Sequence, residues 1–185
     1  TLFFAYELLT LSTYPLVTHS GDTQSVRAGR TYLGLLLGTS LGLQLLAILW
    51  TWQIAGTLDF QDGGILAGNV SDAMAGLLLV LYVFGIGKAA LMPFHRWLPA
   101  AMVAPAPVSA LLHAVAVVKA GVFTILKVVI YIFGLDLLTS IEMSQWLLYA
   151  AAASVLIASL IALKQDNLKA RLAYSTISQL GYVVV

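Results

Sequence analysis

Long apolar runs separated by short polar segments dominate the chain. The runs have the length of membrane-spanning helices, and none alternates apolar and polar residues as a barrel strand does. The pattern therefore predicts an all-α integral membrane protein with about six spans, the third of them broken near Pro93. The expected spans cover residues 2–18, 31–55, 73–104, 107–133, 145–163 and 172–185.

Composition supports a membrane protein and narrows its chemistry. Hydrophobic residues make up 61% of the 185 positions and charged residues only 9%, whereas about a quarter of a soluble protein is charged. The net charge of +1 gives no reason to expect a nucleic-acid partner. The absence of cysteine excludes disulfides and thiolate metal ligands, and no metal-binding or cofactor-binding motif is visible. Both ends lie inside apolar runs, so we expect an interior piece of a longer chain.

Charge is distributed unequally between alternate polar segments. The segments 19–30 and 164–171 carry bases, namely Arg27, Arg30, Lys164, Lys169 and Arg171. The segments on the opposite side carry acids, namely Asp59, Asp62, Asp72, Asp136 and Glu142. Lysine and arginine favour the cytoplasmic side of a membrane. We therefore expect the loops 19–30 and 164–171 to be cytoplasmic.

The stretch from Gly85 to Lys119 combines apolar flanks with features that a plain span lacks. It is cut by Pro93, Pro99, Pro105 and Pro107 and carries several ionisable side chains. Broken helix and charge are tolerated within a bilayer only where protein or a water-filled cavity surrounds them. The stretch is therefore typical of an ion pathway. A second feature, the four-residue spacing of Gly34, Gly38 and Gly42, predicts close approach by a neighbouring helix.

Lys88 and Glu7 form the first candidate pair. Lys88 precedes the break at Pro93, where freed backbone groups need partners, so we expect it to line a hydrated cavity. Glu7 is the acid placed within a span, and Lys88 is its expected cationic partner. The pair could be a static salt bridge that fixes helix packing, or a group that exchanges protons.

Lys119 and His113 share the fourth predicted span. Lys119 follows Pro107 by twelve residues, which places it about 18 Å along a helix and near the middle of the bilayer. It is either a structural donor to backbone carbonyls or a proton carrier, because burial disfavours the charged form of a lysine. His113 is either a packing residue or a proton relay.

Three further groups lie near the ends of these segments. Lys127 is either an exit group or a lysine whose ammonium reaches the membrane surface. His95 and Arg96 lie in the broken segment, where they anchor the break or reach the cytoplasmic interface. We regard Lys127, Pro93 and His95 as candidates for exit or gating.

Two motifs resemble a known family. KAALMPFHRWLPAAMVAPAPVSALLHAVAVVKAGVF is similar to the signature of the proton-conducting, antiporter-like membrane subunits. These include the large membrane-arm subunits of respiratory complex I, subunits of membrane-bound hydrogenases, and large subunits of Mrp-type sodium/proton antiporters. ALKQDNLKARLAYSTISQLGY resembles a second segment of the same family. The resemblance covers this chain but only the central portion of a family member.

The resemblance implies a fold and roles by position. Family members are larger helical bundles built from inverted repeats, of which this chain would be a part. Glu7 matches the family's glutamate, Lys88 the lysine of its broken helix, and Lys119 with His113 its relay. The implied partners are protons, with sodium as an alternative, the lipid bilayer and other membrane subunits of one complex. The implied location is a bacterial or archaeal inner membrane.

The resemblance leaves the function at three alternatives. These are proton translocation within an oxidoreductase complex such as NADH:quinone oxidoreductase, sodium/proton antiport, and a non-conducting scaffold. Ala100 and Ala106 depart from residues that many relatives carry, an acid and a threonine, which leaves the subfamily open. No active site is expected on this chain, so any enzymatic activity would belong to the whole complex.

Overall fold

The computed structural model describes residues 1–140 and 142–184, and within them every regular element is helical. Three helices are long and apolar enough to cross a membrane: Thr23–Ala55, Ala106–Phe133 and Ser144–Leu163. Two apolar helices are shorter, α1 (Leu2–Val17) and α4 (Asp72–Gly85). The prediction of an all-α membrane bundle is confirmed, with the number of spans approximate.

The first helices form an antiparallel pair. α1 is followed by a tight turn and by α2 (Thr23–Thr39), which continues through a π-helical turn (Ser40–Gln44) into α3 (Leu45–Ala55). Most of the predicted loop 19–30 is therefore helical. The residue that starts this helix is Asp22, an N-cap whose carboxylate accepts the Ser25 N–H at 3.3 Å. Hydrogen bonding from the Ser25 side chain lowers the pKa of this carboxyl group.

The break in the third span begins before Pro93. α4 ends at Gly85, and 3-10 turns follow at Gly87–Ala89 and Phe94–Arg96 before the short α5 (Trp97–Ala101). The bond between Met92 and Pro93 is cis, and Ala90 has a positive φ of 54°. The sequence placed Lys88 at the end of the helix that precedes Pro93. In the structure Lys88 lies inside the break itself.

The fourth span is one long helix with two π-helical turns. It consists of α6 (Ala106–Ala110), a π turn (Leu111–Val115), α7 (Val117–Lys127) and a second π turn (Val128–Phe133). Pro107 lies in its first turn, as predicted from the missing N–H of proline. The predicted loop 134–144 contains α8 (Leu135–Ser140) and the start of α9 (Glu142–Leu163).

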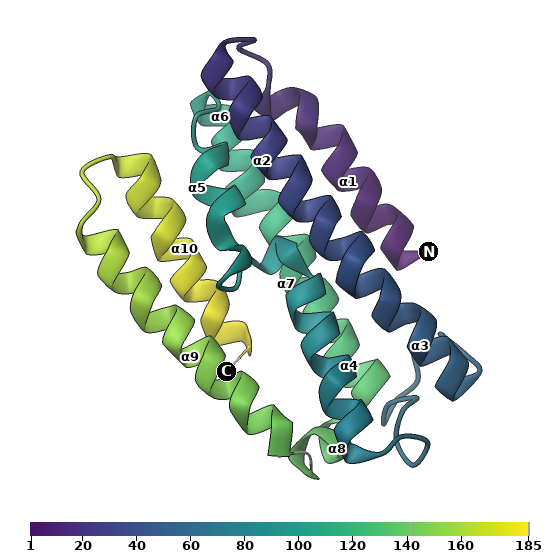
Figure 1. The fold of residues 1–185 in the computed structure, drawn as a ribbon. Helices are drawn as coiled ribbons and strands as arrows, with labels where there is room; N and C mark the ends of the chain where they lie inside the picture. Colours follow the sequence, from purple (N-terminus) through teal and green to yellow (C-terminus); the bar gives the residue numbers. More distant parts are fainter. Residues whose placement is uncertain (141, 185) are drawn as a thin grey trace.

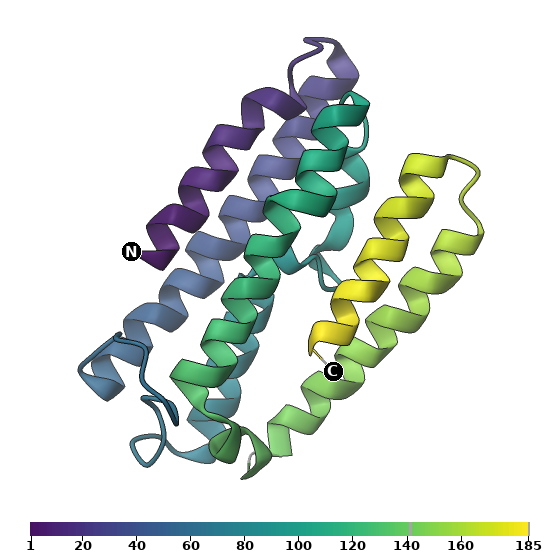
Figure 2. The same ribbon diagram turned by 180° about the vertical axis from the view of Figure 1, so that it is seen from behind.

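The last two helices form a hairpin beside the bundle (Figures 1 and 2). α9 and α10 (Leu168–Val184) approach closely at Gly181, where a methyl group would lie 2.5 Å from Val155. Ser159 and Ser178 share a hydrogen bond of 2.9 Å. Lys169 joins the hairpin to the bundle, because its ammonium donates to the Ala104 carbonyl at 2.9 Å.

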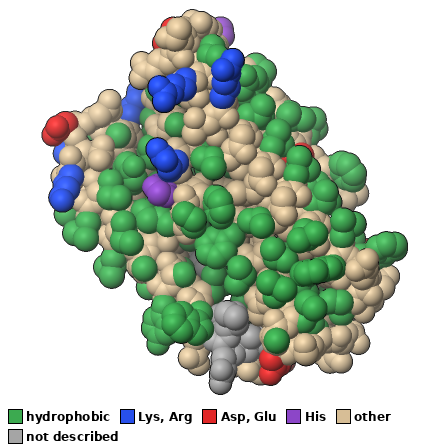
Figure 3. Space-filling model, viewed as in Figure 1, with side chains coloured by type: hydrophobic (Ala, Val, Ile, Leu, Met, Phe, Trp, Pro, Cys, Tyr) green, Lys and Arg blue, Asp and Glu red, His purple; other side chains and the backbone are tan. Residues whose placement is uncertain are grey.

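Charged ends and an apolar middle follow the topology. The turn after α1 and the turn between α9 and α10 lie at one end, and α8 with the segment 56–71 lies at the other (Figure 1). Lys and Arg side chains gather over the upper part of the face in Figure 3, and hydrophobic side chains cover its middle. The basic end also holds Asp22 and Asp166. Both segments predicted to be cytoplasmic thus share one end of the molecule.

Glycines bring α7 and the π turn 40–44 against the break. A methyl group on Gly121 would lie 2.5 Å from the Ala89 nitrogen, and one on Gly85 would lie 2.5 Å from the Gln44 nitrogen. By contrast, a methyl group on Gly34, Gly38 or Gly42 would meet no described atom within 4 Å. The predicted contact face of those three glycines therefore has no partner within the described part of the chain.

We predict that Gly121→Ala destabilises the protein by about 1–3 kcal/mol, because the methyl group would displace the break. Gly34→Ala is the matched control and should be neutral or stabilising by about 0.5–1 kcal/mol, since it adds a helix former in open space. Thermal unfolding of the purified full-length subunit in its complex measures both. Equal midpoints for the two variants would contradict the close packing at Gly121.

Candidate functional site

Lys88 lies at the centre of the candidate site and is fully enclosed, with 0% of its surface exposed. Its ammonium donates to the Tyr6 carbonyl oxygen at 2.5 Å and lies 3.0 Å from the centroid of the Tyr6 ring. Its backbone N–H donates to the Tyr6 hydroxyl oxygen at 3.2 Å. One residue of α1 therefore contacts Lys88 through its carbonyl, its ring and its hydroxyl group.

Side chains replace the backbone hydrogen bonds that the break removes. The indole N–H of Trp97 donates to the Gly87 carbonyl at 2.8 Å, and the Tyr6 hydroxyl accepts the Lys88 N–H. The ring of Trp97 meets the ring of Tyr32 edge-to-face at 5.6 Å, and Tyr32 shares a 2.7 Å hydrogen bond with Thr13. We expected water in a hydrated cavity to bind the backbone groups freed by the break. In the structure, side chains of the protein bind those at Gly87 and Lys88.

Glu7 lies next to Tyr6 on α1, and both oxygens of its carboxylate are buried without a hydrogen-bond partner among the described residues. Its charge nevertheless acts on the Lys88 ammonium. The structure thus brings the two predicted partners into one neighbourhood. The hydrogen bond of the ammonium goes to Tyr6, however, and no hydrogen bond joins Lys88 to Glu7.

His113 lies in the first π turn of the fourth span and contacts α10. Its Nδ1 lies 2.9 Å and its Nε2 3.2 Å from the Thr176 hydroxyl oxygen. Thr176 donates its one hydrogen to the Leu172 carbonyl at 2.9 Å. With its hydrogen on the Leu172 carbonyl, the hydroxyl oxygen is an acceptor for the imidazole, and Nδ1 is the nearer of the two possible donors. This arrangement leaves Nε2 as the basic nitrogen.

Lys119 and Lys127 lie on one helix in different surroundings. The Lys119 side chain is exposed on the surface of the described chain. The Lys127 ammonium is surrounded by aromatic rings, with centroids 4.3 Å away at Tyr131, 5.4 Å at Phe60 and 5.7 Å at Phe123. The π turn and the irregular Ala116 lie between His113 and Lys119, so the geometry of a regular α-helix does not relate the two side chains.

The broken segment ends in His95 and Arg96. The His95 ring lies 6.1 Å from the ring of Tyr174 on α10, and its Nδ1 is buried without a partner among the described residues. Arg96 and Pro93 are exposed. The contact of His95 with α10 agrees with an anchor for the break.

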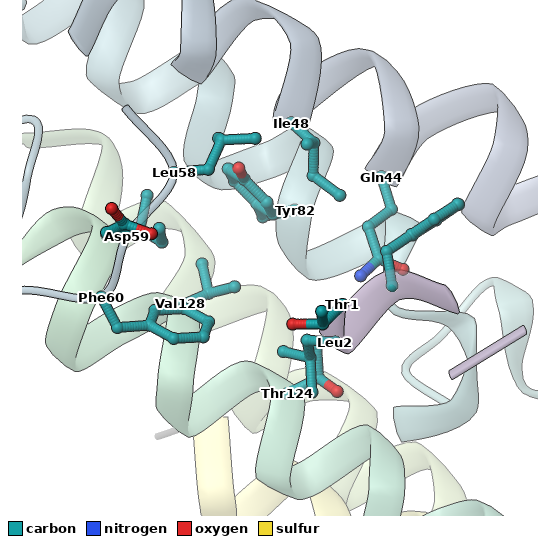
Figure 4. A pocket seen from close by; sticks show the side chains of 12 residues that line it. Thr1, Leu2, Gln44, Ile48, Leu58, Asp59, Phe60, Tyr82, Thr124 and Val128 are labelled. Carbon is teal, nitrogen blue, oxygen red and sulfur yellow. The ribbon is translucent and has the colours of Figure 1, made fainter. Parts of the chain in front are cut away.

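A cavity of about 190 Å³ lies between the start of α1, α3, α4, the π turn Val128–Phe133 and the segment 58–60. The side chain of Gln44 enters it with its amide beside Thr1 and Leu2 (Figure 4). The Gln44 Oε1 has no hydrogen-bond partner among the described residues. Lys88 lines neither this cavity nor the apolar one of about 370 Å³ between α4, α7 and α9.

Tyr6 and Thr176 were not among the residues predicted from the sequence, whereas Trp97 lies with His95 and Arg96 in the segment predicted to anchor the break. Tyr6 precedes Glu7 directly and carries no charge that would have singled it out. Thr176 belongs to the LAYST motif, and its spacing from Lys169 by seven residues places both on one face of α10. No group of three or more His, Cys, Asp or Glu side chains suited to a metal ion occurs in residues 1–140 and 142–184.

Comparison with known proteins identifies the family. The family model described as "NADH:quinone oxidoreductase/Mrp antiporter, TM" matches residues 1–185. The chain belongs to this family. It is an antiporter-like membrane subunit, and the resemblance seen in its motifs is confirmed.

Individual relatives come from two kinds of complex. The chain is 35% identical to NADH-quinone oxidoreductase subunit L of Campylobacter jejuni over all of its length and 30% of that protein. It is 38% identical to NADH-ubiquinone oxidoreductase chain 5 of Metridium senile, over 76% of this chain and 23% of the other. A solved structure of the Mrp complex from Dietzia sp. matches with a TM-score of 0.81 and 30% identity, over 98% of this chain and 20% of that one. The chain thus spans less than a third of these relatives.

We predict that Thr176 selects the tautomer of His113. Thr176→Val removes the acceptor of the Nδ1 hydrogen, so the Nε2–H tautomer should become the major form, whereas Thr176→Ser should keep the parental ratio. Nitrogen-15 NMR of the complex with labelled histidine measures the tautomer populations. Identical populations in the parent and the valine variant would contradict the assigned hydrogen bond.

Proposed function

We propose that this chain provides part of the route by which protons cross the membrane in an antiporter-like complex. The groups proposed to carry the proton are Glu7, Lys88, His113 and Lys119. Lys127, Pro93 and His95 are proposed to act at an exit or a gate. The observation that carries the proposal is the full enclosure of Lys88 within a helix break, held by the neutral groups of Tyr6 and beside the unpaired carboxylate of Glu7.

The environment of Lys88 supports reversible protonation. A buried ammonium is favoured by a carboxylate close to it and disfavoured by an apolar, neutral surrounding. When Glu7 is ionised and close, Lys88 holds its proton. When the field of Glu7 is withdrawn or compensated, Lys88 can release the proton towards His113 and Lys119. The irregular backbone between Gly85 and Trp97 lacks the hydrogen bonds of a regular helix, and we propose that it changes between these arrangements.

His113 supports a relay because its two nitrogens have different roles. In the tautomer that we propose, Nδ1 donates to the Thr176 hydroxyl oxygen at 2.9 Å and Nε2 is the base. A proton taken up at Nε2 gives an imidazolium, which can then pass a proton onwards. Lys119, exposed on this chain, is in a position to receive it from within the complete subunit or from a neighbouring part of the complex.

Sodium/proton antiport is the second candidate function. The match to the Mrp complex from Dietzia sp. favours it, at a TM-score of 0.81, whereas the quinone oxidoreductase relatives favour redox-driven proton pumping. In either case we propose that the chain works with other membrane subunits in an inner membrane, and that the driving reaction takes place outside this chain.

We predict that Lys88→Ala or Lys119→Ala lowers proton flux about 100-fold or more, because a proton-transfer group typically contributes 10²–10⁴-fold to rate. The measurement uses inverted vesicles that contain the full-length subunit in its complex, with and without sodium. Lys164→Ala is the matched control, because this lysine is exposed in the turn after α9.

The outcomes separate the candidate functions. Flux that is lost in the Lys88 variant and depends on sodium in the parent supports antiport. Flux that is lost in the variant and depends on an electron donor supports a redox-driven pump. Parental flux in Lys88→Ala, with normal assembly, would remove the basis for the proposed route.

Sidedness follows from the charge pattern and gives a separate prediction. Single cysteines at Ser20 and Gln61, both exposed, have no native cysteine of this chain as background. We expect a membrane-impermeant maleimide added to intact cells to label Gln61→Cys and leave Ser20→Cys unlabelled, because loops rich in lysine and arginine stay cytoplasmic. The reverse labelling would invert the proposed orientation.

A further inference from the structure

Two consecutive residues of α1, Tyr6 and Glu7, can each interact with the Lys88 ammonium. Tyr6 holds it through the ring face and the backbone carbonyl, at 3.0 Å and 2.5 Å. Glu7 acts on it through charge, yet its two carboxylate oxygens have no hydrogen-bond partner in the described chain. The ammonium therefore occupies a neutral site, while the carboxylate of the adjoining residue Glu7 has no partner in the described chain.

The neutral site is suited to a cation. The face of an aromatic ring carries negative electrostatic potential, and its attraction for an ammonium grows when both are removed from water. Tyr6 is 3% exposed and Lys88 0%. The Tyr6 carbonyl also points its oxygen at the ammonium. Tyr6 thus offers two electron-rich acceptors that carry no net charge.

The hydroxyl group of Tyr6 contacts the backbone of Lys88, whereas its ring contacts the ammonium. It accepts the backbone N–H of Lys88 at 3.2 Å and thereby ties the ring to the break. Lys88 is itself closely packed, because a methyl group on Gly121 would lie 2.6 Å from its carbonyl carbon. The hydroxyl hydrogen bond therefore keeps the Tyr6 ring at the break if the ammonium moves.

We propose that Tyr6 is a positioning residue that serves as the second partner of Lys88, so that the ammonium alternates between Glu7 and the Tyr6 ring. This inference rests on the proposed proton route. An ammonium that leaves a carboxylate in a low-dielectric interior must otherwise be left unpaired, at a large free-energy cost. The Tyr6 site reduces that cost and keeps the ammonium close by, in the arrangement from which proton release is easiest.

The test varies the electrostatics of the ring at constant shape. Phenylalanine and its mono-, di- and trifluorinated forms are placed at position 6 of the full-length subunit, and proton flux is measured in vesicles that contain the complex. Fluorine withdraws electron density from the ring face, so flux should fall stepwise, by about tenfold from phenylalanine to the trifluoro form. Tyr6→Leu, which lacks a π face, should fall at least as far.

The control is the same series at Phe4, which is 79% exposed on the same helix and does not contact Lys88. Flux should be constant across that series. A flat series at position 6, with Lys88→Ala inactive, would overturn the role of Tyr6 and leave the proton route standing. Parental flux in Lys88→Ala would overturn both. Because the fluorinated rings have nearly the same shape, failure of Tyr6→Leu to assemble would not prevent the decision.

Discussion

The structure depends on how the backbone is satisfied where the helix breaks between Gly85 and Trp97. A backbone group left without a partner in the membrane interior costs about several kcal/mol, so a break persists only where other groups replace the lost hydrogen bonds. Here the Trp97 indole binds the Gly87 carbonyl and the Tyr6 hydroxyl binds the Lys88 amide. The two side chains come from opposite sides of the break, α5 and α1. The break is therefore a product of tertiary packing as much as of its prolines.

The same packing explains why Lys88 can stay at depth. α7 approaches the break at Gly121, where no side chain larger than hydrogen fits without movement. α1 covers the other side with Tyr6. The Lys88 ammonium is fully buried there and has the neutral acceptors of Tyr6. Tyr6 thus has two contacts with Lys88. Its hydroxyl group accepts the backbone N–H, and its ring lies against the ammonium.

The sequence was sufficient for the architecture and for the neighbourhood of Lys88 and Glu7. Prolines and lysines in an apolar stretch pointed to a broken span, and the charge of Glu7 pointed to the neighbourhood of Lys88, although the hydrogen bond of the ammonium goes to Tyr6. Local patterns could not reveal the rest, because it arises from contacts between distant segments. The end of α4 at Gly85, eight residues before Pro93, depends on Gln44 and Trp97. The π turn at His113 leaves no mark in hydrophobic periodicity, and the expected face of Gly34, Gly38 and Gly42 had the right spacing without a described partner.

Three lysines in apolar segments have three different environments around their ammonium groups. Lys127 lies among three aromatic rings, whose faces attract a cation. Lys119 is exposed on this chain, so its surroundings are set by whatever packs there. Lys88 alone combines full burial with both a neutral site and a nearby unpaired carboxylate within the described residues. Two alternative partners for one charge are what a group needs in order to switch, whereas one strong partner would only hold it.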